Sequence, residues 1–509
     1  MDLSVLKSLK GSKITAKVLS AALVEAIESG TLAPGAKLPS TRDIADYLEL
    51  SKTTVVKVYK FLSSRGYISS SPGAGTWVSA IAQTRQAACS AASSKSGYPW
   101  ESRYSSQATN LQSLSLASLD EHGLDEHAFD GRDFDELAFD GRDIGELAFD
   151  EINFGATPPD LLPLRQWRKA YLRVCDSLDR KTFAVNQDVF GYRPLREAIA
   201  GFLRRSKGIV CEAEQVVLAS GVQSVVSPVM NLLVNAGDLA VCENPGFYGA
   251  REQFRCQGAR VLTVDVDREG LIVDQLAAIN GSVQWLYVAP SCQEPTGVML
   301  SEQRRHQLLS FCEQRGAAIL EDDWDSEFHY GKRTVPSLFS LDKTGSVIYF
   351  YSFWRLLYPL TSVGFLLIPH ALIGLFERFK NVWQRQFTLV EHQVLTELLS
   401  DGQVEEHIGT MWKECRQRRQ ALIFSLTERF KGQVEVVSSN TGGHVVARFS
   451  GDLSAPGLIK AAQSVGLPAA LTTPYYDHSP VQGEIMFRFA GLAPSQIEAR
   501  VKALAAAML

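Results

Sequence analysis

The chain has 509 residues, 45% of them hydrophobic and 9% aromatic, and its formal net charge is -5. This length and apolar content suffice for a large core and predict more than one domain. The sequence has no run of 18 or more apolar residues, and residues 1–17 mix lysines with short apolar runs, which argues against a membrane protein and a signal peptide and predicts a cytoplasmic protein.

Charge is unevenly distributed along the chain. Residues 1–80 carry ten Lys or Arg against six Asp or Glu, whereas residues 119–153 carry thirteen acidic residues and two basic ones. A basic N-terminal region favours a polyanionic partner, and an acidic segment favours exposure to solvent.

The first eighty residues show the pattern of a small helical DNA-binding domain. An amphipathic helix is predicted over 14–28, and two further helices over 42–48 and 52–64 follow N-cap residues. Two short helices joined by a tight turn have helix-turn-helix spacing. The alternating segments 67–69 and 76–78, separated by a Pro-Gly-Ala-Gly turn, predict a β-hairpin wing.

The helix at 52–64 has the pattern of a recognition helix. Its predicted buried face consists of Val55, Val58, Tyr59 and Leu62. The side chains left near its start and on its outer side are those that such a helix presents to the major groove, namely Lys52, Thr53, Thr54 and Lys57.

The stretch LPSTRDIADYLELSKTTVVKVYKFLSSRGYI, followed by GAGTWV, resembles the winged helix of the GntR family. The resemblance implies binding to double-stranded operator DNA, with contacts from Arg42, Ser51, Lys52, Thr54 and the wing at Gly75. Lysine stands at positions 52 and 57, where arginine is common, and lysine keeps phosphate contacts while giving up the bidentate reading of guanine. The alternative is a small helical domain with solvated lysines.

Residues 81–153 are predicted to be a flexible acidic linker. They lack apolar periodicity, and AFDGRDFDEL at 128–137 is followed by AFDGRDIGEL at 138–147, a ten-residue repeat. The simplest interpretation is a spacer that sets the reach of the DNA-binding domain. A sharper hypothesis is that its carboxylates compete with DNA for the basic face.

From residue 154 to the end, short apolar runs alternate with longer helical patterns. Seven strands are predicted, over 216–219, 239–242, 261–266, 285–289, 317–320, 347–353 and 363–368. This alternation predicts an α/β domain with a mostly parallel sheet covered on both faces. Such sheets bind ligands beyond the carboxyl ends of their strands.

The sequence motifs at these predicted strand ends resemble those of the MocR branch of the GntR family. The matching stretches are GYRPLREAIAGFL, SGVQ, ENPGF, PSCQEPTG and EDDWDSEF, in the usual order. The resemblance implies a multidomain protein with an N-terminal winged helix-turn-helix and a C-terminal α/β domain of the fold-type I PLP-transferase kind at 154–509. It also implies a head-to-tail homodimer and pyridoxal 5'-phosphate (PLP) as the cofactor.

Several residues depart from the family pattern. The lysine that binds PLP as an imine is Arg355, and a guanidinium stays protonated and cannot replace a neutral primary amine. The family's phosphate-binding residues are replaced by Val222, Trp354 and Ser362, and its ring-contacting tyrosine and histidine are replaced by Trp324 and Cys292. Covalent binding of PLP is therefore predicted to be lost, and catalytic residues are not expected.

A remnant of the pocket is retained. By resemblance, Asp322 matches the partner of the pyridine nitrogen, Phe247 the ring-stacking residue, and Arg488 the arginine that binds a substrate carboxylate. With Trp324 and Arg355 they form a predicted pocket for a small carboxylate or phosphate effector. A buried arginine needs a counter-charge, so Arg355 is expected to pair with Asp322 or with an acid group of a ligand.

The leading hypothesis is a sequence-specific transcription regulator whose aminotransferase-like domain dimerises and senses an anionic effector, without a metal and without a membrane partner. The alternatives are a regulator that binds PLP noncovalently, a PLP-dependent aminotransferase fused to a DNA-binding domain, and a purely structural dimerisation domain.

Overall fold

The computed structural model describes residues 16–28, 31–33, 35–48, 50–64, 67–71, 75–78, 98–105, 108, 157, 159–178, 188–331, 335–383, 387–437, 441–450 and 455–508. The acidic ten-residue repeat lies outside these residues. Among the helices of this part of the chain, none is long and apolar enough to cross a membrane.

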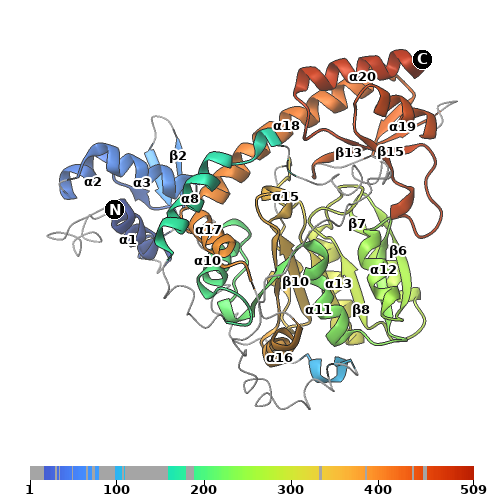
Figure 1. Ribbon diagram of the computed structural model, residues 1–509, viewed down its shortest axis with the longest axis horizontal. Coiled ribbons are helices and arrows are strands. Elements are labelled where there is room, and N and C mark those ends of the chain that lie inside the picture. The colour runs from blue at the N-terminus through green and yellow to red at the C-terminus, as the bar shows by residue number, and fades with distance from the viewer. Residues whose placement is uncertain are drawn as a thin grey trace, which may run out of the picture.

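The N-terminal unit is a winged helix-turn-helix, as predicted. It comprises α1 (Ala16–Glu28), β1 (Lys37–Leu38), α2 (Thr41–Leu48), α3 (Lys52–Ser64), β2 (Ile68–Ser71) and β3 (Gly75–Val78). The three strands form an antiparallel sheet in the order β1-β3-β2. Apolar side chains of the three helices close a small core of their own, which includes Leu23, Ile44 and Leu62. This unit is drawn in blue in Figure 1.

The large sheet of the C-terminal region has eight strands in the order β4-β11-β10-β9-β8-β5-β6-β7. They are β4 (Val216–Ser220), β5 (Leu239–Asn244), β6 (Arg260–Asp267), β7 (Gly270–Leu271), β8 (Trp285–Val288), β9 (Ala318–Asp322), β10 (Val347–Ser352) and β11 (Val363–Leu367). The central pairs are parallel, and β11 and β7 run against their neighbours. All seven predicted strands and the mostly parallel arrangement are confirmed.

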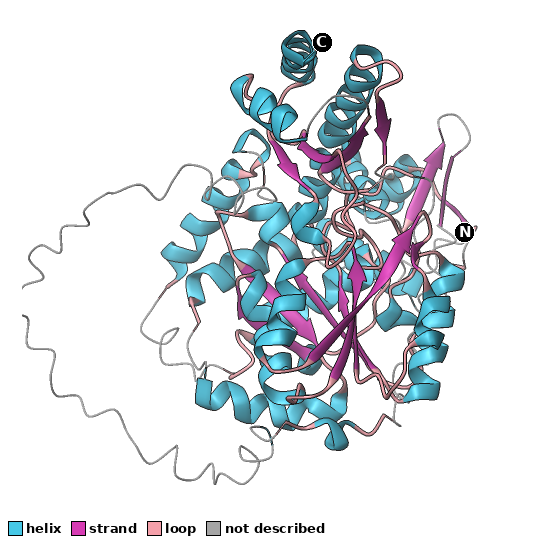
Figure 2. Cartoon of the chain, turned by 90° about the vertical axis from the view of Figure 1, so that its right-hand side faces the viewer, coloured by secondary structure: helices cyan, strands magenta, loops and turns pink. Residues whose placement is uncertain are grey.

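Both faces of this sheet are buried, which explains why its strands read as continuous apolar runs. Successive side chains of a strand point to opposite faces, so one strand supplies two cores. On β10, Val347, Tyr349 and Tyr351 belong to one core, whereas Ile348 and Phe350 belong to the other. Figure 2 shows helices on both sides of the sheet.

The helices of this region are α8 (Leu164–Ser177), α10 (Arg193–Ser206), α11 (Val222–Leu233), α12 (Tyr248–Cys256), α13 (Glu302–Arg315), α14 (Leu338–Leu341), α15 (Trp354–Leu357), α16 (Ile373–Trp383), α17 (Leu389–Ser400), α18 (Gln403–Arg429), α19 (Ala455–Ser464) and α20 (Pro494–Met508). The last three accompany a second, antiparallel sheet with the order β12-β13-β15-β14. Its strands are β12 (Val434–Val436), β13 (His444–Phe449), β14 (Ala469–Leu471) and β15 (Glu484–Arg488). We call this unit the C-terminal subdomain (Figure 1, upper right).

A short segment within the predicted linker packs against the large sheet. Trp100 is 2% exposed, its indole N–H donates to the carbonyl of Gly345 at 2.9 Å, and its ring centroid lies 6.2 Å from that of Trp285. Tyr98 adds a hydrogen bond from its hydroxyl to the carbonyl of Gly316. Trp100 is therefore part of the large domain's core, although it lies inside the range 81–153 that the composition marked as linker.

Replacing Trp100 with alanine tests this packing. We expect Trp100→Ala to lower the free energy of unfolding by about 3–5 kcal/mol, because it leaves a cavity beside Trp285 and an unpaired carbonyl at Gly345. Chemical denaturation of the full chain followed by circular dichroism measures the change. Phe424→Ala is the control, since Phe424 is 65% exposed and its loss should change stability by less than about 0.5 kcal/mol. Equal effects of the two substitutions would contradict a core role for Trp100.

Candidate functional site

The exposed end of α3 carries most of the predicted DNA-binding residues. Ser51 caps the helix, because its hydroxyl accepts a hydrogen bond from the backbone N–H of Thr54 at 3.1 Å. The same hydroxyl lies 2.8 Å from that of Thr53 and 2.7 Å from that of Thr54. Lys52 and Lys57 are exposed. The opposite face of α3, with Val55, Val58, Tyr59 and Leu62, is buried as predicted.

The packing of α2 against α3 fixes the position of Arg42. Ser40 and Asp43 form reciprocal hydrogen bonds between side chain and backbone at the start of α2, at 3.0 and 3.1 Å. The hydroxyl of Tyr59 on α3 donates to the carbonyl of Pro39 at 2.5 Å. Arg42 follows this junction, in the first turn of α2, and it is exposed.

The wing contributes Gly75 and a lysine that the sequence did not single out. Gly75 has φ +131°, and a Cβ there would lie 2.7 Å from Cε of Lys37. The amino group of Lys37, on β1, lies 5.9 Å from the centroid of the Trp77 ring. Glycine at position 75 therefore leaves room for a cation on the wing. The sequence did not point to Lys37, because a single lysine between two turns belongs to no repeating pattern of apolar residues.

The second candidate site lies at the carboxyl ends of β8, β9 and β10. Asp322 ends β9, and its carboxylate accepts hydrogen bonds from the hydroxyl of Tyr287 and from the backbone N–H of Trp324. Burial, offset in part by the Tyr287 hydrogen bond, raises the pKa of Asp322 to about 7. The Tyr287 hydroxyl thus donates to the carboxylate of Asp322, which the resemblance expects to bind the pyridine nitrogen of PLP.

Arg355 lies in α15, directly after β10, and it is buried. Its Nε donates to Oδ1 of Asp325 at 2.5 Å, and its guanidinium carbon is 5.3 Å from the centroid of the Phe328 ring. Burial disfavours the charged form of Arg355, but the attraction of nearby groups, chiefly the Asp325 carboxylate, is larger than this effect. The pKa of Arg355 is therefore raised. The sequence correctly predicted a buried arginine with a counter-charge, but the expected partner Asp322 is wrong because Asp325 takes that place.

A glycine of the C-terminal subdomain makes room for this ion pair. A Cβ on Gly443 would overlap Nη2 of Arg355. The backbone N–H of Gly443 also donates to Oδ2 of Asp325 at 3.1 Å. Asp325 itself has φ +55°, which turns its carboxylate towards both partners. The ion pair therefore joins the large sheet to the C-terminal subdomain.

Trp324 and Arg488 lie on the side of the C-terminal subdomain. The Trp324 indole stacks on the ring of His444, with centroids 6.2 Å apart and planes at 15°, and its N–H donates to the carbonyl of Cys292 at 2.8 Å. Arg488 on β15 is the register partner of His444 on β13. Side chains of directly opposed residues share a face of the sheet, so Arg488 lies on the face that meets Trp324.

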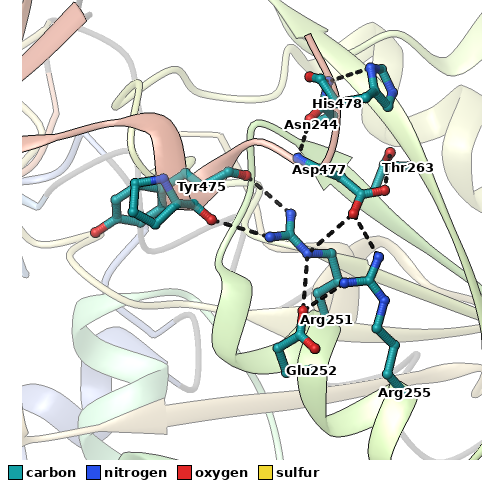
Figure 3. A network of polar contacts seen from close by, with 9 residues as sticks. Asn244, Arg251, Glu252, Arg255, Thr263, Tyr475, Asp477 and His478 are labelled. Carbon is teal, nitrogen blue, oxygen red and sulfur yellow. Dashed lines mark hydrogen bonds and ion pairs between the residues drawn. The ribbon is translucent and has the colours of Figure 1, made fainter. Parts of the chain in front are cut away.

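Phe247 immediately precedes α12, beside a network that forms a second link between the two units (Figure 3). From α12, Arg251 donates to the carbonyls of Pro474 and Tyr475 at 3.2 Å each. Arg255 pairs with Asp477 at 2.6 Å. The C-terminal subdomain is thus tied to the large domain on the Phe247 side as well as at Arg355.

The segment that follows α15 meets a carboxylate from α17. Oε1 of Glu391 accepts from the hydroxyl of Thr361 at 2.5 Å and from the backbone N–H of Ser362 at 3.1 Å. The carbonyl of Ser362 accepts from the backbone N–H of Gly221 at 2.7 Å. A cavity of about 340 Å³ opens here, lined by residues of α8, α17 and the segment 358–362. The sequence did not point to Glu391.

Comparison with known proteins identifies both units. Residues 150–469 match the family described as aminotransferase class I and II, and residues 15–78 match the gntR family of bacterial regulatory proteins. The chain belongs to the aminotransferase class I and II family. Its large domain has the fold-type I architecture, and a GntR-type domain precedes it.

Relatives include regulators and enzymes. The chain is 28% identical over 491 residues to the probable rhizopine catabolism regulatory protein MocR of Rhizobium meliloti, covering 95% of this chain and 91% of that protein. It is 27% identical over 360 residues to 2-aminoadipate transaminase of Thermus thermophilus, covering 70% of this chain and 88% of that protein. The crystal structure of LysN, an α-aminoadipate aminotransferase of the same organism complexed with N-(5'-phosphopyridoxyl)-L-leucine, matches with a TM-score of 0.62 and 26% identity, covering 70% of this chain and 90% of that chain.

This aminotransferase family implies PLP, and the places where the resemblance puts the cofactor's lysine and its phosphate are both engaged by groups of the protein itself. At the expected lysine position stands Arg355, which is already paired with Asp325. At the expected phosphate site the backbone N–H of Ser362 is bonded to the carboxylate of Glu391, and the N–H of Gly221 is bonded to the Ser362 carbonyl. A phosphate there would face a carboxylate, and these two N–H donors are already engaged.

Adding a methyl group at Gly443 tests the ion pair. We expect Gly443→Ala to lower the free energy of unfolding by about 3–5 kcal/mol, because Arg355 must move and leave Asp325 buried without its partner. Denaturation curves of the full chain measure the loss. In an Arg355→Ala/Asp325→Ala background, the same substitution should cost less than about 1 kcal/mol, since no charge remains to be separated.

The matched control is Gly409→Ala, within α18. A Cβ on Gly409 has no heavy atom of the described residues within 4 Å, so alanine there should stabilise the helix by about 0.5–1 kcal/mol. If Gly443→Ala were as well tolerated as Gly409→Ala, the close approach of Arg355 to Gly443 would be wrong.

Proposed function

We propose that this protein is a sequence-specific DNA-binding transcription regulator whose aminotransferase-like domain dimerises and senses a small anionic effector, with transaminase chemistry lost. The observation that carries the proposal is the exposed, polar start of α3 on a fully packed winged helix. The regulators among the relatives support it.

In this proposal α3 enters the major groove of operator DNA. Ser51, Thr53 and Thr54 present hydroxyls at the start of the helix, where recognition helices contact base edges. The charged side chains Arg42, Lys52 and Lys57 contact phosphates, and the wing at Gly75, with Lys37, adds a further backbone contact. We place the protein in the cytoplasm because its proposed target is operator DNA.

The second part of the proposal is a homodimer with head-to-tail arrangement, as in the MocR branch that the sequence resembles. On α8, Leu164, Tyr171 and Leu172 are 55%, 45% and 51% exposed. Residues seven and eight positions apart share a helix face, so they form an apolar stripe. Burying such a stripe against a second copy supports dimerisation, and a dimer suits repeated half-sites in DNA.

The third part concerns the pocket. An ion-paired guanidinium at position 355 cannot form the covalent link to PLP, so we infer that this link and transamination are absent. Arg488, beside Trp324 and near the strand ends that carry Asp322 and Phe247, supplies a cation for a carboxylate or phosphate group of an effector. The alternatives of noncovalent PLP binding and of a working PLP-dependent aminotransferase are supported by the enzymes among the relatives, and the mismatched residues weigh against the second.

The salt dependence of DNA binding tests the α3 interface. We expect Lys52→Ala and Lys57→Ala each to weaken binding to DNA fragments selected from a random pool, whatever their sequence, and to reduce the slope of log K against log salt by about 1, because one phosphate contact is lost. Fluorescence anisotropy at several salt concentrations measures both quantities. Lys431→Ala is the control, since Lys431 is exposed on the C-terminal subdomain. Unchanged affinity and slope in both α3 variants would refute this interface.

Incubation with PLP tests the loss of covalent chemistry. We expect no borohydride-fixed adduct on the segment 352–359 by peptide mass spectrometry and no amino-group transfer, because position 355 offers no neutral amine. An active class I aminotransferase treated in parallel is the positive control. Amino-group transfer, or recovery of one coenzyme per chain attached to a single side chain, would overturn this part of the proposal.

A further inference from the structure

The cavity beside Glu391 differs in chemistry from the anion pocket at Arg488. Its wall includes the aromatic rings of Trp167 and Tyr171 from α8 and of Tyr358 from the segment after α15. Among the described residues that line it, Glu391 is the one charged residue, and none is Lys or Arg. At about 340 Å³ it lies at the lower end of the range for small-molecule sites, which is roughly 300–1,000 Å³.

The carboxylate of Glu391 is half satisfied. Its Oε1 is fixed by the Thr361 hydroxyl and the Ser362 N–H, whereas Oε2 has no hydrogen-bond or ion-pair partner among the residues that the structure describes. The two bonds to Oε1 hold the group in one orientation. A fixed negative oxygen beside aromatic faces is the arrangement that recognises organic ammonium groups.

A structural role for Glu391 explains only part of this arrangement. An acidic residue in the first turn of α17 is favoured by the helix dipole, and the bonds to Thr361 and Ser362 fasten the segment after α15. Those roles engage one carboxylate oxygen and require no aromatic rings around a cavity. They do not explain why Oε2 of Glu391 lacks a partner among the described residues, why three aromatic rings line the cavity, or why no described lining residue is cationic. These features together fit a bound ligand.

We propose that this cavity binds a small organic cation, with its ammonium group on Oε2 of Glu391 and its carbon atoms against Trp167, Tyr171 and Tyr358. None of the residues that line this site belongs to the proposed anion pocket or to α3, so its failure would leave the proposed regulator function standing. It also reverses the sign of the charge expected near Ser362, where the related enzymes are expected to bind a phosphate.

Three probes with short alkyl chains and different head groups test the charge preference in the full chain. Isothermal titration calorimetry at pH 7 should show saturable binding of butylammonium and no binding of butanol or butanoate, since only the cation gains from Glu391 and the rings. The variant Glu391→Gln keeps an oxygen acceptor for Thr361 and Ser362 and removes the charge. We expect it to weaken butylammonium binding by about 10- to 100-fold.

Two further variants separate ligand recognition from folding. Tyr171→Leu, at a position 45% exposed, should weaken butylammonium by about 2- to 5-fold through loss of a cation–π contact. Glu397→Gln is the matched control on the same helix, because Glu397 pairs with Arg173 at 2.6 Å and does not line this cavity. It should leave butylammonium affinity unchanged.

Several outcomes would overturn the proposal. They are equal binding of butanol, absence of butylammonium binding, or unchanged affinity in Glu391→Gln. Because Tyr171 also belongs to the apolar stripe of α8, sedimentation velocity accompanies the titrations. If Glu391→Gln dissociated a dimer while butylammonium failed to bind, the cavity would hold a cationic side chain of a second copy, and the small-molecule proposal would be wrong.

Discussion

The buried ion pair between Arg355 and Asp325 is the interaction on which the arrangement of the two sheets depends. Both side chains are almost completely removed from solvent, at 6% and 1% exposure. Separating two buried charges is strongly destabilising, because each would be left without compensation. Since Asp325 also accepts from the backbone of Gly443, a change in the pair also affects a hydrogen bond to the C-terminal subdomain. Arg355, at the position where the resemblance implies a lysine, is therefore a structural link.

Acidic groups around this link are shifted towards their neutral forms. Burial raises the pKa of Glu243 and of Glu294 to about 8, and that of Asp322 to about 7. An acid whose pKa is raised on folding favours the folded state at low pH and loses that contribution as pH rises through the folded pKa. Near neutral pH these carboxyls are partly protonated, so the surroundings of the ion pair carry less negative charge than their composition suggests. This lowers the repulsion that an anion bound at Arg488 would meet.

The sequence predicted the fold well and the site only in part, for physical reasons. The seven strands and the buried face of α3 were visible because apolar periodicity is a local property. The partner of Arg355 was not, because the positive φ of Asp325 decides which carboxylate turns inwards, and Asp322 is already engaged by Tyr287 on a neighbouring strand. The sequence did not indicate that Trp100 is buried in the core, because the Ser- and Ala-rich residues around it show no repeating pattern of apolar residues.

Two links between the large domain and the C-terminal subdomain bear on how the proposed effector pocket senses a ligand. One link is the Arg355–Asp325 pair with Gly443, and the other joins Arg251 and Arg255 of α12 to the loop before β15 (Figure 3). Arg488 lies on β15 itself. A ligand shifts an equilibrium only by the difference in its affinity for two states. An anion that bound Arg488 and also touched the strand ends of the large sheet would favour the arrangement in which the two units are held by these links, and this preference requires no covalent step.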